Sequence, residues 1–198
     1  MSEAATHEHA LAEAGSVPGV DNRKFGMWLF IANEVLFFTA LIGMFLAYRG
    51  QPTWAEFHAH LNIPVTAIAT FILLTSSLMV VLALSAAQSG NRRGLMVGLL
   101  ATILLGSIFI GIQATEFSKL GLDGLVLSTN VNTSTFFTLT GFHGLHVIIG
   151  VLWCLVVLRR AARGGFSKGN HLAIELFGLY WHFVDVVWIV LFTIIYLI

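Results

Sequence analysis

Apolar residues dominate five long stretches of the chain, which lie at about 25–47, 64–88, 95–117, 133–158 and 172–198. Each stretch is long enough to cross a bilayer, because about 20 helical residues rising 1.5 Å each span a hydrocarbon core of roughly 30 Å. The connections between them are too short to hold a soluble domain. The pattern therefore predicts an all-α, polytopic membrane bundle of five transmembrane helices.

The chain divides into a polar N-terminal tail, 1–22, and a transmembrane domain, 23–198. The tail lacks the basic start and short apolar core of a cleavable signal sequence. His7 and His9 form a His-x-His pattern, but with no further ligand nearby a solvated tail is favoured over a metal site.

Basic residues predict the orientation of the bundle. Only Arg49 and Lys119 lie in one set of alternate loops. The other eight fall on the opposite side: Arg23, Lys24, Arg92, Arg93, Arg159, Arg160, Arg163 and Lys168. By the positive-inside rule the N-terminus is cytoplasmic, and five spans put the C-terminus on the opposite face.

Composition agrees with the membrane class, since 57% of the residues are hydrophobic and only 10% are charged. The formal net charge is zero, so no electrostatic argument favours a nucleic acid partner. The single cysteine, Cys154, excludes an internal disulfide and is expected to be a packing residue.

Ionisable residues interrupt two of the apolar stretches. His143 and His146 lie three apart within one stretch, and His182 and Asp185 lie three apart within the last. A charged group at the centre of a transmembrane helix costs roughly 2.5 to 3.5 kcal/mol on insertion scales. We therefore expect all four to face protein or a cavity and to serve a function.

Glu34 lies about ten residues beyond Lys24, which places it roughly 15 Å below the basic surface and near mid-membrane. Two interpretations stay open. Glu34 is either a neutral acid hydrogen-bonded to a neighbouring helix or an interface carboxylate tied to proton movement.

Glu116 and Gln113 lie one turn apart near the end of the third stretch, and the fourth begins from the same side. We predict that Glu116 pairs with His143 or His146, because pairing removes the cost of leaving either group alone.

On the fifth stretch the helical spacing puts Glu175, His182 and Asp185 on one face. We expect this polar stripe to be buried.

A metal site is conceivable, because His143, His146, His171 and His182 accompany Glu116 and Glu175. The Glu-x-x-His pairs of a carboxylate-bridged bundle are missing, so we predict neither a metal site nor catalytic residues on this chain. An independent proton or ion channel is a further alternative.

Several motifs together resemble subunit III of the haem-copper terminal oxidases. They are Asn33–Phe38, Gln113–Phe117, Ser134–Phe137, Thr140–Gly150 and Tyr180–Trp188. The resemblance covers essentially all of residues 25–198.

The resemblance implies a subunit that carries no haem or copper and packs beside catalytic subunit I, with subunit II and possible other respiratory-chain subunits as further partners. The complex reduces oxygen to water and pumps protons in the bacterial cytoplasmic membrane. This subunit would stabilise subunit I, bind phospholipid in a cleft and support proton uptake. Glu34 matches the family's buried carboxyl group. Arg160 matches a basic residue near a lipid phosphate, and we assign the same role to His171.

The chain is similar to the shorter, five-span members of that family and starts at what would be the third helix of the seven-span members. Five-span members include quinol oxidases, so the electron donor, cytochrome c or a quinol, stays open.

Overall fold

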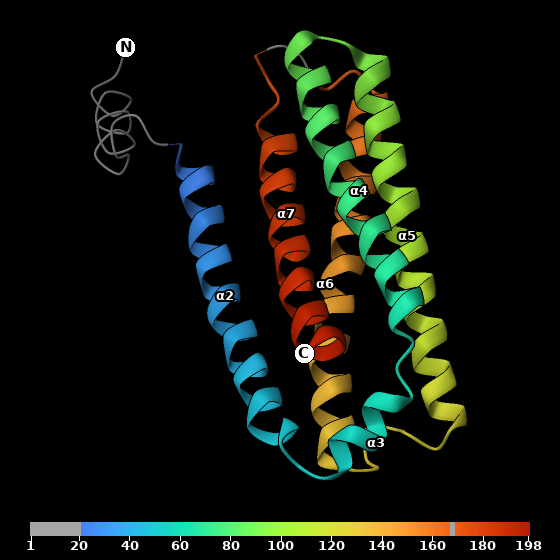
Figure 1. The fold of residues 1–198 in the computed structure, drawn as a ribbon. Coiled ribbons are helices and arrows are strands. Elements are labelled where there is room, and N and C mark those ends of the chain that lie inside the picture. The colour runs from blue at the N-terminus through green and yellow to red at the C-terminus, as the bar shows by residue number, and fades with distance from the viewer. Residues whose placement is uncertain (1–20, 167–168) are drawn as a thin grey trace, which may run out of the picture.

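The computed structural model describes residues 21–166 and 169–198, which fold as a helical bundle (Figure 1). The elements in order are α2 (Asn22–Arg49), α3 (Thr53–Ala59), α4 (Ile63–Ser89), α5 (Arg92–Leu122), α6 (Val131–Ala162), α7 (Leu172–Phe192) and a terminal π-helix, η1 (Thr193–Leu197). Five of these helices are long and apolar enough to cross a membrane, with α7 and η1 forming one span. The five predicted transmembrane helices are confirmed. The short helix α3 was not predicted.

Side-chain caps fix where four of the long helices begin. Asp21 accepts a hydrogen bond from the backbone N–H of Arg23 at the start of α2. Asn62, Asn91 and Asn130 cap α4, α5 and α6 in the same way. Each cap satisfies an N–H that has no partner within its own helix. Polar residues at the ends of the apolar stretches therefore set the helix boundaries.

The helices α4, α5, α6 and α7 form the body of the bundle, and α2 packs on its side against α6 and α7 (Figure 1). The body is centred on Trp181 of α7, which is almost fully buried. Its indole N–H donates to Ser76 of α4 at 3.0 Å. Gly106 of α5 and Gly150 of α6 give the ring its space, because a Cβ at Gly150 would lie 2.5 Å from Trp181 Cζ3.

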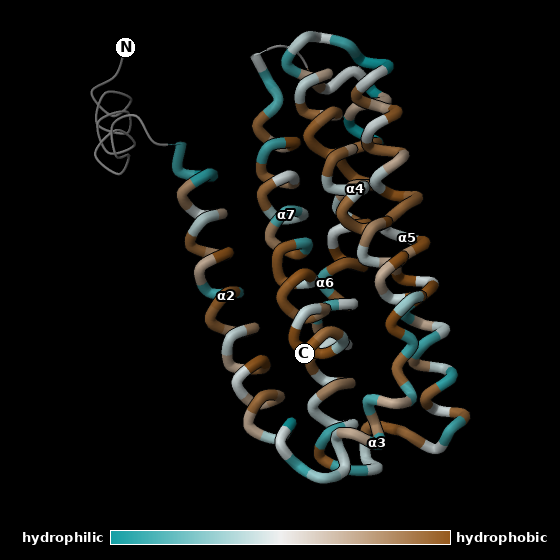
Figure 2. Tube along the Cα trace, in the orientation of Figure 1, coloured by the Kyte–Doolittle hydropathy of each residue, from teal (hydrophilic) through white to brown (hydrophobic). Residues whose placement is uncertain are grey.

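Hydrophobic residues make up most of each long helix, and hydrophilic residues are concentrated near the helix ends (Figure 2). Many of the large hydrophobic residues are exposed on the outside of the bundle. Phe71 of α4 and Leu36 of α2 are 71% and 70% exposed. An apolar surface of this extent is normal against lipid and would be unusual in water. The chain is an integral membrane protein.

The predicted division into a tail, 1–22, and a membrane domain stays a prediction, because residues 1–20, with His7 and His9, lie outside the described residues. Lys168 lies outside them as well.

Candidate functional site

Among the described residues, seven of the eight basic residues predicted to share one side lie at one end of the bundle, where α2 begins and where α4–α5 and α6–α7 are joined. At this end Lys24 of α2 forms an ion pair with Glu175 of α7. Glu175 also contacts His171 one turn earlier, with 2.9 Å between Oε1 and Nε2. Glu175 therefore binds two basic groups and ties α2 to α7.

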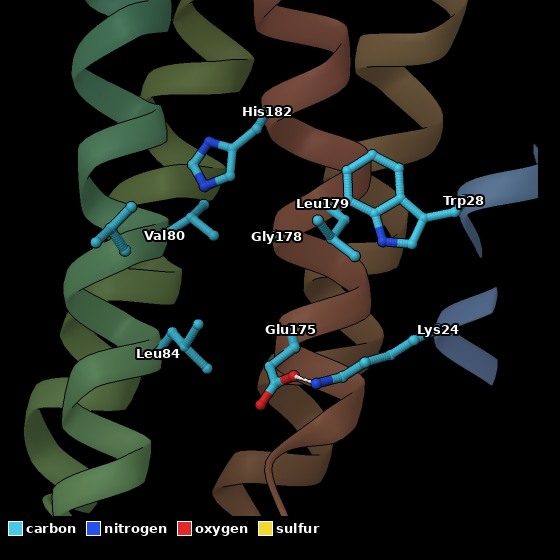
Figure 3. A pocket seen from close by; sticks show the side chains of 9 residues that line it. Lys24, Trp28, Val80, Leu84, Glu175, Gly178, Leu179 and His182 are labelled. Atoms are coloured by element: carbon cyan, nitrogen blue, oxygen red, sulfur yellow. Dashed lines mark ion pairs between the residues drawn. The ribbon is translucent and has the colours of Figure 1, made fainter. Parts of the chain in front are cut away.

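A cavity of about 320 Å³ opens beside this ion pair, between α2, α4 and α7 (Figure 3). Lys24 and Glu175 stand at one end of the cavity and the imidazole of His182 at the other. The wall between them is largely apolar and is formed by Trp28, Val80, Val81, Leu84, Gly178 and Leu179. The cavity thus joins a charged rim to a histidine two turns further along α7.

His182 and Asp185, the predicted polar pair on α7, both face α4. The imidazole Nδ1 of His182 lies 2.6 Å from the hydroxyl of Ser77. Ser77 also lies close to the Asp185 carboxyl group, which is only 5% exposed. Of the predicted stripe, only Asp185 is buried, whereas Glu175 and His182 are half-buried and line the cavity.

Glu34 contacts His146 at the interface of α2 and α6, with 3.2 Å between Oε2 and Nε2. The other ring nitrogen, Nδ1, lies 2.7 Å from the carbonyl oxygen of Phe142 and donates to it. Nε2 and the carboxyl group then share one proton between them. The helix-to-helix hydrogen bond that we considered for Glu34 is present.

The predicted pairing of Glu116 with His143 or His146 is wrong. Glu116 accepts hydrogen bonds from Tyr196 at 2.8 Å, from Thr66 at 3.3 Å and from Gln113 at 3.4 Å.

The physical reason is depth within the bundle. Glu116 lies six residues, about 9 Å, before the end of α5. His143 lies twelve residues, about 18 Å, after the start of α6. The α4 helix and the C-terminal π-helix lie at the level of Glu116 instead, and they supply two of its three donors, Thr66 and Tyr196.

His143 is held as a core residue. Its Nε2 lies 3.2 Å from the carbonyl oxygen of Val184, and its ring stacks on Trp188 with 4.8 Å between centroids. The side chain is 1% exposed. This imidazole therefore binds backbone and aromatic surface of α7 rather than a charged side chain.

Arg160, one of the two predicted phosphate-binding residues, is exposed at the end of α6, with its guanidinium 4.9 Å from the centroid of the Phe166 ring. His171 is engaged by Glu175, and its Nδ1 is buried. Phosphate binding at these two residues stays a prediction.

Sequence reasoning missed the hydroxyl groups of α4. Thr66, Thr70 and Ser77 bind Glu116, Trp188 and His182 respectively. Their positions recur about every one or two helical turns, so a polar stripe on the second apolar stretch was the signal that could have found them. Within residues 21–166 and 169–198 no cluster of three or more His, Cys, Asp or Glu side chains is placed to hold a metal ion.

Comparison with known proteins assigns the bundle to a family. The family model for cytochrome c oxidase subunit III matches residues 6–198. The chain belongs to the cytochrome c oxidase subunit III family. The resemblance seen in the sequence motifs is confirmed.

Bacterial members of this family are similar over most of their length. Cytochrome c oxidase subunit 3 of Alkalihalophilus pseudofirmus is 38% identical over 89% of this chain and 86% of its own. Cytochrome bo(3) ubiquinol oxidase subunit 3 of Pseudomonas aeruginosa is 34% identical over 96% of this chain and 89% of its own. The subunit of Prototheca wickerhamii is 39% identical, but the match covers only 68% of that chain.

Proposed function

We propose that this chain is the non-redox subunit III of a proton-pumping haem-copper oxygen reductase in the aerobic respiratory chain. The observation that carries the proposal is the family match over residues 6–198, together with five helices of spanning length. Its partners are the catalytic subunit I, subunit II and other respiratory-chain subunits. Haem and copper belong to those partners.

The histidines of the membrane bundle support a structural role. His143 binds the backbone of α7, His146 binds Glu34, and His182 binds Ser77. Each imidazole already has a partner within the chain. Histidines that are hydrogen-bonded within the chain support the proposal of a subunit without a redox centre.

The bacterial cytoplasmic membrane is the proposed location, with the N-terminus cytoplasmic. Bacterial relatives of similar length support the location. Basic residues gathered where α2 begins and where α6 ends support the orientation.

Phospholipid binding and support of proton uptake complete the proposal. Exposed Arg160 can offer its guanidinium to a phosphate at the end of α6, with the apolar surface of the bundle beside the acyl chains. The Glu34–His146 pair shares a proton at mid-bundle and is the group that the proposal ties to proton uptake.

A quinol oxidase is the second candidate. The Pseudomonas aeruginosa subunit named for ubiquinol oxidation matches 96% of this chain. The electron donor binds another subunit, so the present chain fits either complex.

Purification through a tag on this chain in mild detergent tests the proposal. We expect haem absorption bands and the large oxidase subunits in the eluate, and no haem on the chain once those subunits are stripped away. Oxidation of cytochrome c or of a quinol by the eluate then identifies the donor. A colourless protein without partners would overturn the proposal and favour an independent channel. Haem that stays on the stripped chain would refute the non-redox assignment.

A further inference from the structure

Asp185 is a buried carboxyl group whose hydrogen bonding is incomplete. Its Oδ2 is buried and has no hydrogen-bond partner among the described residues. By contrast, Glu116 of α5, a half-buried acid beside the start of α4, accepts hydrogen bonds from three donors. A buried carboxylate without enough donors is unstable as an anion, and a proton or a water molecule would relieve it.

A continuous set of polar atoms links Asp185 to the cavity. His182 lines the cavity and points from α7 toward α4 (Figure 3). Its Nδ1 contacts the Ser77 hydroxyl at 2.6 Å, and Ser77 lies beside the Asp185 carboxyl group. The second ring nitrogen, Nε2, bonds to no described residue and is not one of the buried atoms without a partner. One serine therefore connects an imidazole on the cavity wall with the carboxyl group behind it.

We propose that the cavity between α2, α4 and α7 holds water and that His182 and Ser77 relay protons from it to a proton-binding site at Asp185. A proton carried by the cavity water as H₃O⁺ adds to Nε2 of His182 and leaves H₂O behind. The resulting imidazolium releases its Nδ1 proton to the Ser77 oxygen. Ser77 passes its own hydroxyl proton to the Asp185 carboxylate. One proton enters and one is bound, so Asp185 becomes neutral and His182 ends as the other neutral tautomer.

The surroundings suit this transfer. The charged pair Lys24–Glu175 stands at one end of the cavity, with His171 bound to Glu175. The α4 helix has no titratable side chain of its own. From α6, His143 is bound to the carbonyl oxygen next to Asp185. Relay through one hydroxyl is thus the direct route between cavity and carboxyl group.

Infrared difference spectroscopy of the full chain in lipid nanodiscs tests the relay without any partner subunit, so its outcome is independent of the proposed function. Spectra are recorded between acidic and alkaline pH, in H₂O and in D₂O. We expect a carboxylic acid C=O band that shifts in D₂O and disappears in Asp185→Asn. Isotope labelling of aspartate marks the same band in the unmodified chain, because its only other aspartates, Asp21 and Asp123, are exposed.

The rate of H/D exchange of this band tests the route. Ser77→Ala and His182→Phe should slow it roughly tenfold or more, because exchange then waits for local opening of the bundle. Thr75→Ala is the matched control, since that hydroxyl binds the carbonyl oxygen of Phe71 in its own helix. A band that aspartate labelling does not move overturns the site. Equal exchange rates in the Ser77, His182 and Thr75 variants overturn the relay.

Discussion

The packing of Trp181 against glycine gives the sharpest test of the fold. A Cβ at Gly150 would lie 2.5 Å from Trp181 Cζ3 and 2.7 Å from Cε3, and the ring is fixed on its other side by Gly106 and by its bond to Ser76. Gly150→Ala therefore inserts a methyl group where none fits. Gly144→Ala, on the same helix, meets nothing within 4 Å.

The magnitude follows from two opposing effects. Alanine gains up to about 1 kcal/mol over glycine within a helix, and both variants share this gain. Overpacking a filled core costs about 1 to 3 kcal/mol, and only Gly150→Ala meets that cost. We expect Gly150→Ala to be the less stable of the two by about 1 to 3 kcal/mol.

Thermal unfolding of the purified chain in detergent, followed by far-UV circular dichroism, measures this difference. For a chain of this size each kcal/mol shifts Tm by about 2 to 4 °C. The Gly150 variant should unfold at the lower temperature. Equal midpoints for the two variants would refute the close contact of α6 with Trp181.

Three further predictions concern the polar contacts between helices. Tyr196→Phe removes the strongest donor to Glu116 and should lower stability by about 1 to 3 kcal/mol in the same unfolding assay; an unchanged midpoint would contradict that bond. Glu34→Leu leaves His146 without its partner and should cost about 1 to 3 kcal/mol, whereas Glu34→Gln keeps a hydrogen-bonding group and should lose less. Lys24→Met breaks a half-exposed ion pair, so the loss should stay within about 1 kcal/mol and vanish in high salt.

The fold follows from the sequence because long apolar runs can satisfy their backbone hydrogen bonds in lipid only as helices. The helix α3 escaped prediction because seven residues are too few to show a periodic pattern. The third stretch was predicted to end at about 117, whereas α5 continues to Leu122. The fourth was predicted to begin at about 133, whereas α6 begins at Val131.

The candidate site was only partly predictable. Apolar surroundings identified Glu34, His146, His182 and Asp185 as groups that face protein or a cavity, because an ionisable side chain in an apolar run is costly against lipid. Their partners depend on which helices are neighbours and at what depth they meet. No sequence spacing specified that Ser77, 105 residues away, would contact His182.

The position of α2 on the side of the bundle has a consequence for biosynthesis. Its partners in the structure are α6 and α7, and the residues of the Glu34–His146 contact are 112 positions apart. Because α2 leaves the ribosome before α6 and α7, it has to wait in the bilayer until these two spans have been made. Until then the carboxyl group of Glu34 on α2 has no partner from α6. Incomplete chains therefore expose a polar group that is paired with His146 in the complete bundle.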